Sequence, residues 1–139
     1  MARKISNISA SLFAAILIAN AAPPRSVLNG VYTTAQAVRG AAAYREECAR
    51  CHSQNLMGGE GSPALTGPGF LQNWTGKTVG DLFERTRQTM PTDNPASLSR
   101  QTVADIIAHI LSANQLPAGS RELEPEAEQL NAIRIEKKP

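Results

Sequence analysis

The two cysteines of the chain stand three residues apart, and a histidine follows at once, in the run Cys48-Ala49-Arg50-Cys51-His52. Two thiols on one helical turn can each form a thioether bond with a vinyl group of a porphyrin, and the adjacent imidazole can bind its iron. This is the spacing that covalent attachment of c-type haem requires. The run therefore predicts one covalently bound haem c, attached through Cys48 and Cys51 and ligated by His52.

Three other uses of the cysteines are disfavoured by the rest of the sequence. A structural zinc site needs four Cys or His ligands, and the chain has only one further histidine, His109. A thioredoxin-like dithiol needs a βαβ setting, whereas alternating or β-branched runs are almost lacking. A disulfide across two intervening residues is strained and uncommon. Haem attachment remains, on condition that the protein is exported, because haem is attached outside the cytoplasm.

The N-terminus has the form of an export signal. Arg3 and Lys4 precede an apolar stretch over residues 8–19, which is shorter than the about 20 residues that span a membrane. Ala19-Asn20-Ala21 has the form of a signal-peptidase site, and a second such site, Ala35-Gln36-Ala37, lies farther from the apolar stretch. We therefore expect a periplasmic or otherwise exported protein with a leader over residues 1–21 or 1–37. Retention of the stretch as a membrane anchor is the alternative.

Charge and composition argue against nucleic acid as a partner. The chain has 14 basic and 12 acidic residues, and removal of residues 1–21 with Arg3 and Lys4 leaves 12 of each. Two haem propionates would then give the mature protein a negative net charge. No basic run with interleaved aromatic residues occurs. The roughly 100 remaining residues suffice for one small domain with few core aromatics, and a buried porphyrin would supply the missing apolar surface.

The elements that must position the haem motif are predicted to be helices joined by loops. Residues 40–51 are mostly good helix formers and place the motif at the end of a first helix. Residues 58–69 are rich in glycine and proline and predict a loop. Thr78-Val79-Gly80-Asp81 has the form of a capping box, beginning a helix that reaches Thr89 and is stopped by Pro91.

A last strong helix is predicted over residues 100–114, with Ser99 as its N-cap. After Pro117 the chain is a charged tail, with a short helix near residues 126–130 and an extended segment at residues 133–135. The last strong helix carries one apolar stripe at helical spacing, made of Val103, Ile106, Ile107, Ile110 and Leu111.

A haem ligated by His52 on one face leaves the ligand on its other face to be found. Met57 is only five residues past His52, so it is better placed to cover the haem edge than to reach the iron. Met90 stands at a helix end before Pro91, which fixes φ and turns the chain out of the helix, so that the sulfur can face the iron. His109 lies off the apolar stripe, which favours a surface or helix-contact role. Met90 is therefore the predicted second ligand.

Over residues 40–114 the chain resembles the class I cytochromes c, which are all-helical domains with a single haem. The resemblance is carried by Gly40 and Tyr44 before the cysteines, by the Cys-x-x-Cys-His run and by the pair Met90-Pro91. It implies that Gly40 and Tyr44 pack against the last helix. It also implies that the haem motif and Met90 hold the haem iron from opposite faces.

The resemblance further implies two contacts around the haem. The backbone carbonyl of Pro63 would accept a hydrogen bond from the imidazole of His52 and fix its orientation, and Trp74 would hydrogen-bond a propionate. The family usually has an aromatic residue where His109 stands, which brings the usual aromatic packing between the terminal helices into question. The pair Met90-Pro91 and residues 114–120 are similar to small bacterial cytochromes, some of which serve periplasmic quinoprotein dehydrogenases.

The predicted function is one-electron transfer, not catalysis, between a periplasmic dehydrogenase and an oxidase or other acceptor. One alternative is a haem subunit of a quinoprotein dehydrogenase, docked through the glutamate-rich residues 122–128, although we expect this tail to fold back on its own domain. The other is an enzyme or gas sensor with an open iron position. The predicted architecture is all-α, with three to four helices around one haem over residues 38–116. An extended tail follows over residues 117–139, and no stable membrane span is expected in the mature form.

Overall fold

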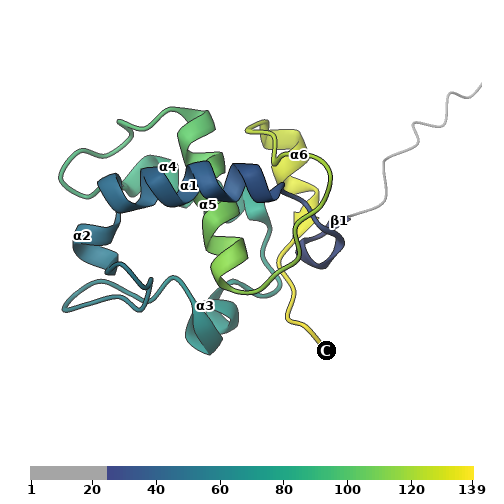
Figure 1. Cartoon of the computed structure of the whole chain (residues 1–139), viewed down its shortest axis with the longest axis horizontal. Helices are drawn as coiled ribbons and strands as arrows, with labels where there is room; N and C mark the ends of the chain where they lie inside the picture. Colours follow the sequence, from purple (N-terminus) through teal and green to yellow (C-terminus); the bar gives the residue numbers. More distant parts are fainter. Residues whose placement is uncertain (1–24) are drawn as a thin grey trace, which may run out of the picture.

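Two helices of equal length, α1 (Thr34–Glu47) and α5 (Arg100–Ala113), cross and pack together at the centre of the molecule (Figure 1). The computed structural model describes residues 25–139. At the crossing, a Cβ atom on Gly40 would come within 1.7 Å of the backbone carbonyl oxygen of Asp105. Only glycine permits backbones to approach so closely. The predicted apolar stripe of α5 is buried in the core, and its members Val103, Ile107 and Leu111 have no exposed surface.

Between these two helices the chain forms three more, α2 (Ala49–His52), α3 (Gly67–Trp74) and α4 (Val79–Thr89). Side chains cap the longer helices as the sequence predicts. Thr78 accepts a hydrogen bond from the backbone N–H of Asp81 at 3.0 Å, and the Asp81 carboxylate accepts one from the Thr78 N–H in return. Ser99 caps α5 by accepting from the N–H of Thr102 at 3.0 Å. These bonds satisfy backbone donors that have no partner within a helix, so each helix begins at a defined residue.

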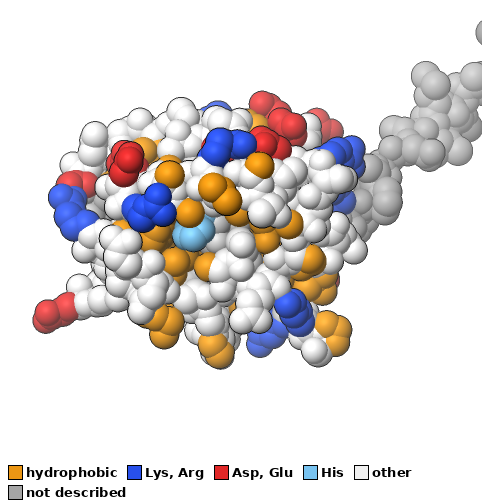
Figure 2. All heavy atoms as spheres, viewed as in Figure 1, with side chains coloured by type: hydrophobic (Ala, Val, Ile, Leu, Met, Phe, Trp, Pro, Cys, Tyr) orange, Lys and Arg blue, Asp and Glu red, His pale blue; other side chains and the backbone are white. Residues whose placement is uncertain are grey.

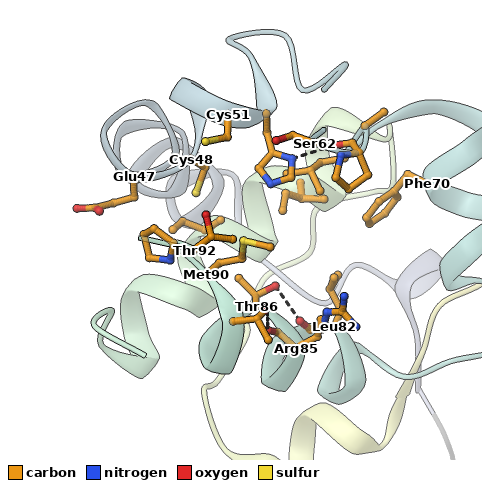
Figure 3. A pocket seen from close by; sticks show the side chains of 18 of the residues that line it. Glu47, Cys48, Cys51, Ser62, Phe70, Leu82, Arg85, Thr86, Met90 and Thr92 are labelled. Carbon is orange, nitrogen blue, oxygen red and sulfur yellow. Dashed lines mark hydrogen bonds between the residues drawn. The ribbon is translucent and has the colours of Figure 1, made fainter. Parts of the chain in front are cut away.

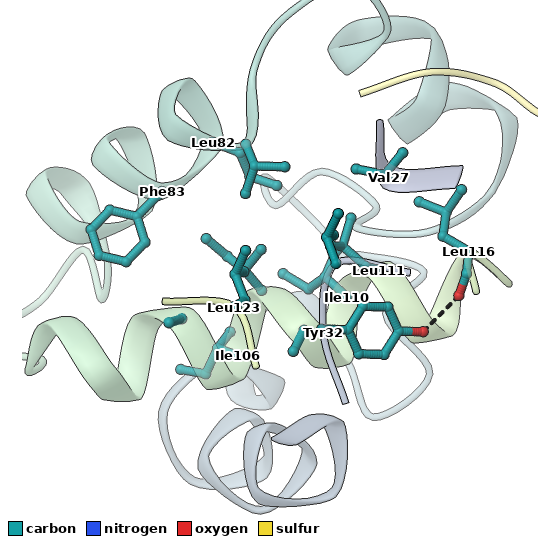
Figure 4. Packing of buried hydrophobic residues seen from close by; sticks show 14 of the residues in the cluster. Val27, Tyr32, Leu82, Phe83, Ile106, Ile110, Leu111, Leu116 and Leu123 are labelled. Atoms are coloured by element: carbon teal, nitrogen blue, oxygen red, sulfur yellow. Dashed lines mark hydrogen bonds between the residues drawn. The ribbon is translucent and has the colours of Figure 1, made fainter. Parts of the chain in front are cut away.

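The two ends of the described chain meet on the far side of α5 from the haem motif. Strand β1 (Arg25–Ser26) pairs in parallel with β2 (Ile133–Arg134), a 3₁₀ turn covers Val27–Asn29, and α6 (Ala127–Asn131) packs on α4. Figure 4 shows side chains of both ends gathered around α5. The buried apolar residues that these ends contribute are Val27, Val31, Tyr32, Leu116, Leu123, Leu130, Ile133 and Ile135.

Polar contacts fix the C-terminal tail to the junction of α1 and α5. The side chain of Gln36 is fully buried. Its amide oxygen accepts a hydrogen bond from the backbone N–H of Leu123 at 2.7 Å, and its amide NH₂ donates one to the Leu123 carbonyl at 3.0 Å. The Arg39 guanidinium lies between the carboxylates of Asp105 and Glu122, with N–O distances of 3.2 and 2.7 Å. The tail therefore folds back on the domain as an integral part of its core.

The all-α class predicted from the sequence is confirmed, but the described residues form six helices where three to four were expected. Two of the six, α2 and α6, are about one turn long. The first long helix begins at Thr34, six residues before its predicted start, because Thr33 accepts a hydrogen bond from the Gln36 N–H and caps it. Helix α3 was not expected, since Gly67 and Pro68 suggested a loop; proline is in fact well suited to a first helical turn.

The crossing of α1 and α5 yields a stability prediction. Replacing Gly40 with alanine forces a methyl group into the Asp105 backbone, which cannot move aside as a side chain can, so Gly40→Ala should lower the free energy of unfolding by about 1–3 kcal/mol or more. Gly69→Ala is the matched control, because a Cβ atom there meets nothing within 4 Å. Guanidinium unfolding of both holoproteins, followed by circular dichroism, measures the difference. Equal stabilities would show that the crossing is not tight.

Candidate haem-binding site

A cavity of about 380 Å³ opens between α2, α3, α4 and α5. Its volume lies within the range of small-molecule and cofactor sites. Figure 3 shows that the sulfur atoms of Cys48, Cys51 and Met90 point into the same space. All six residues that the sequence assigned to the haem line this cavity: Cys48, Cys51, His52, Pro63, Trp74 and Met90.

His52 ends α2 and is held in one orientation by a backbone contact. Its Nδ1 atom lies 2.8 Å from the carbonyl oxygen of Pro63. A carbonyl oxygen can only accept a hydrogen bond, so Nδ1 must carry the proton. The lone pair is then left on Nε2, which is the atom that a metal would use. The side chain is nearly buried, so both tautomer and ring position are defined.

A short, tightly turned loop returns Pro63 to His52. The N–H of Gly58 donates to the carbonyl of His52 at 3.0 Å, and Gly59 and Ser62 exchange two backbone hydrogen bonds. Gly58 has a φ of +78°, and a Cβ atom there would lie 2.5 Å from the carbonyl oxygen of Ser62. A glycine is therefore required at this turn. The glycine-rich segment, predicted only as a loop, is the element that positions the Pro63 carbonyl.

The two cysteines differ in exposure although they share one turn. Cys48 joins α1 to α2 and is half-buried, whereas Cys51 is exposed, and both are free thiols. Burial, with smaller contributions from Glu47 and Cys51, raises the pKa of the Cys48 thiol to about 11. Both thiols line the cavity whose wall also carries His52.

Met90 reaches the cavity from the end of α4. The helix ends at Thr89, and Met90 has extended backbone (φ −119°, ψ 148°), as is usual for a residue before proline. Figure 3 places Met90 across the cavity from Cys48, with Thr86 beside it on α4. Met57 lies outside the cavity lining, with 61% of its surface exposed. The structure thus brings Met90, and not Met57, toward His52 and the cysteines.

Apolar side chains form the walls between these polar groups. The rings of Phe70 and Trp74 pack with their centroids 6.3 Å apart, and α4 and α5 contribute Leu82, Ile106 and Ile110. Below this wall, the Asn114 side chain donates to the carbonyl of Leu65 and accepts from the N–H of Gly67, both at 3.0 Å. Sequence reasoning missed the structural role of Asn114, whose only signal was an amide residue at a predicted helix end.

The donor set of the cavity fits haem c. Two free thiols and an imidazole nitrogen come from α2 and the residue before it, a thioether sulfur comes from the end of α4, and the lining also includes apolar side chains. Within residues 25–139, no group of three or more His, Cys, Asp or Glu side chains is arranged to hold a metal ion. The donors therefore suit the iron of a porphyrin, whose own nitrogens complete the coordination, better than a bare cation.

His109 lies outside the cavity and packs between α1 and α5. Its ring is 5.3 Å from that of Tyr44, centroid to centroid, at a tilt of 54°. The Tyr44 hydroxyl in turn donates to the carbonyl of Ser53, the residue after His52, at 2.8 Å. An aromatic contact between the terminal helices is therefore present, with an imidazole as one partner. Burial, and to a lesser extent the charge of Arg45, lowers the pKa of His109.

This lowered pKa predicts a pH dependence of stability. As the pH falls below about 6.5, the unfolded chain binds a proton at His109 before the folded protein does, so the folded state loses stability between that pH and the lower pKa of folded His109. The parent should therefore lose more stability between pH 8 and pH 5 than His109→Phe. His52, the only other histidine, is present in both proteins and cancels from the comparison. Parallel stability curves would contradict the prediction.

The comparison with known families agrees with this site. A family model described as cytochrome C oxidase, cbb3-type, subunit III matches residues 35–110, more than half of the chain. The matched range contains every residue that lines the cavity. No curated protein and no solved structure matches the chain.

Proposed function

We propose that this chain, which belongs to the family of cbb3-type cytochrome c oxidase subunit III, is an electron carrier. We further propose that His52 and Met90 ligate its haem iron. The match identifies residues 35–110 as a class I cytochrome c domain, so the chain carries one covalently bound haem c and takes part in electron transfer. We assign attachment to Cys48 and Cys51. The observation that carries the proposal is the placement of His52 and Met90 on the lining of one cavity, with Met90 across from the cysteines.

The residues around the cavity are suited to holding both ligands in fixed positions. The Pro63 carbonyl orients the imidazole of His52, and the end of α4 presents the sulfur of Met90. When bound, haem c supplies an iron that gains and loses one electron, and thioether ligation favours its reduced form more than a second imidazole would. Two protein ligands leave no iron position for a substrate, which favours a carrier over an enzyme or gas sensor.

We propose that Trp74 and its neighbours hold the propionate side of the haem. Trp74 lines the cavity and is half-buried, and the ammonium group of Lys77 lies 5.0 Å from the centroid of its ring. Arg85 also lines the cavity. These groups place an indole N–H and two positive charges on the wall formed by α3 and α4, where they could offset carboxylate charge.

We further propose export to the periplasm with cleavage after Ala21. Domains of this family are typically extracytoplasmic. The leader itself lies outside the described residues. Cleavage after Ala37 would remove Val27, Tyr32 and Gln36, which are buried in the folded domain, whereas cleavage after Ala21 retains them. Within residues 25–139, no helix is long and apolar enough to cross a membrane.

The family description names an oxidase subunit, and on that ground we propose a terminal oxidase as the electron acceptor and a periplasmic dehydrogenase as the donor. Figure 2 shows acidic and basic side chains interspersed on one face of the domain, without an extended patch of one sign. Docking of a quinoprotein dehydrogenase through residues 122–128 finds less support, because Glu122 and Leu123 are already bonded to α1.

Substitution of Met90 tests the proposal. The oxidised parent should show the methionine–iron charge-transfer band, and the reduced parent should bind added carbon monoxide only slowly. Met90→Ala should lose the band and bind carbon monoxide rapidly, because one iron position is then open. Met57→Ala is the matched control and should behave as the parent, since Met57 is exposed and outside the cavity lining. Rapid binding by the parent itself would overturn the carrier function in favour of an open-site enzyme or sensor.

A further inference from the structure

One ion pair connects the haem-attachment motif with the segment that follows Met90. Arg50 stands between the two cysteines on α2, and Asp93 lies three residues past Met90. The guanidinium of Arg50 and the carboxylate of Asp93 are in direct contact, and both residues line the cavity. The pair therefore spans the cavity edge, from the wall that carries His52 to the wall that carries Met90.

Apart from Leu98, which packs against the hydrophobic core, the segment over residues 91–98 has few other attachments. Residues 92–97 are all exposed, and the one backbone hydrogen bond within the segment is local, from the N–H of Asn94 to the carbonyl of Pro91. Among the residues that the structure describes, the Arg50–Asp93 contact is the only hydrogen bond or ion pair that joins this segment to another element.

The opposite wall is held far more firmly. The carbonyl of His52 accepts a hydrogen bond from Gly58, and that of Ser53 accepts one from the buried Tyr44. His52 itself is bonded to Pro63. Residues 91–98 make fewer contacts than the loop that holds His52. We therefore expect that Met90 would leave the cavity by movement of residues 91–98.

We propose that the Arg50–Asp93 ion pair is a latch that holds residues 91–98, and with them the sulfur of Met90, over the haem iron. The inference rests on the proposed ligation by Met90. Arg50 and Asp93 are positioning residues, since they act on the iron only through Met90. Because their side chains are 73% and 57% exposed, the pair is screened by salt and shifts the equilibrium between bound and released Met90 only about two- to fivefold.

The test measures carbon monoxide binding to the ferrous holoprotein, whose rate follows the release of Met90. At low ionic strength, Arg50→Gln and Asp93→Asn should each accelerate binding about two- to fivefold. The charge-exchanged double variant, Arg50→Asp with Asp93→Arg, should return toward the parent rate. High salt should bring the parent to the rate of the single variants. Arg87→Gln is the control, because it breaks the Arg87–Glu84 ion pair within α4, which does not cross the cavity, and it should leave the rate unchanged.

Two results would overturn the latch. One of them leaves ligation by Met90 standing, and the other rejects it as well. If the parent shows the methionine–iron charge-transfer band but the single variants bind carbon monoxide at the parent rate, the latch is wrong and Met90 ligation stands. If the parent lacks the band, Met90 is not a ligand and both proposals fail. Denaturant unfolding of each variant confirms that the exposed substitutions leave the fold intact.

Discussion

The close contact of α1 and α5 at Gly40 is the constraint on which the rest of the structure depends. It brings the end of α1, and therefore the cysteines and His52 that follow, to a defined position beside Ile106 and Ile110 of α5. The same crossing places Gln36 and Arg39 where they bind the C-terminal tail. The contact between the backbones of α1 and α5 thus sets the position of the haem motif. It also sets how the two ends of the described chain pack on the opposite side of the core.

The two sides of the cavity are built on different physical principles. His52 lies in a network of backbone hydrogen bonds that its own loop provides, with Gly58 allowing the turn that returns Pro63. Met90 depends instead on the end of α4 and on residues 91–98, which are mostly exposed and have one ion pair to another element. We therefore expect any change in ligation of the haem to begin on the side of Met90.

Residues whose type and spacing are fixed by chemistry could be placed from the sequence. The haem motif could be recognised because thioether formation requires its residue types and spacing, and Met90 because few other side chains offer a soft ligand. The structure brings these residues together on the lining of one cavity. The Arg50–Asp93 pair could not be predicted, since it joins positions 43 residues apart and charged side chains are common on surfaces. The inclusion of residues 25–33 in the core was also missed, because two-residue strands such as β1 carry no periodic signal.

Ligation of the haem iron by the sulfur of Met90 can be measured by proton NMR of the reduced protein with methyl-labelled methionine. A methionine methyl held over a porphyrin is shifted far upfield by the ring current. Exposed Met57 provides an internal reference at an ordinary shift. If Met90 is a ligand, the parent should show one strongly upfield methyl signal that disappears in Met90→Ala. Ordinary shifts for every methionine methyl in the reduced parent would contradict it.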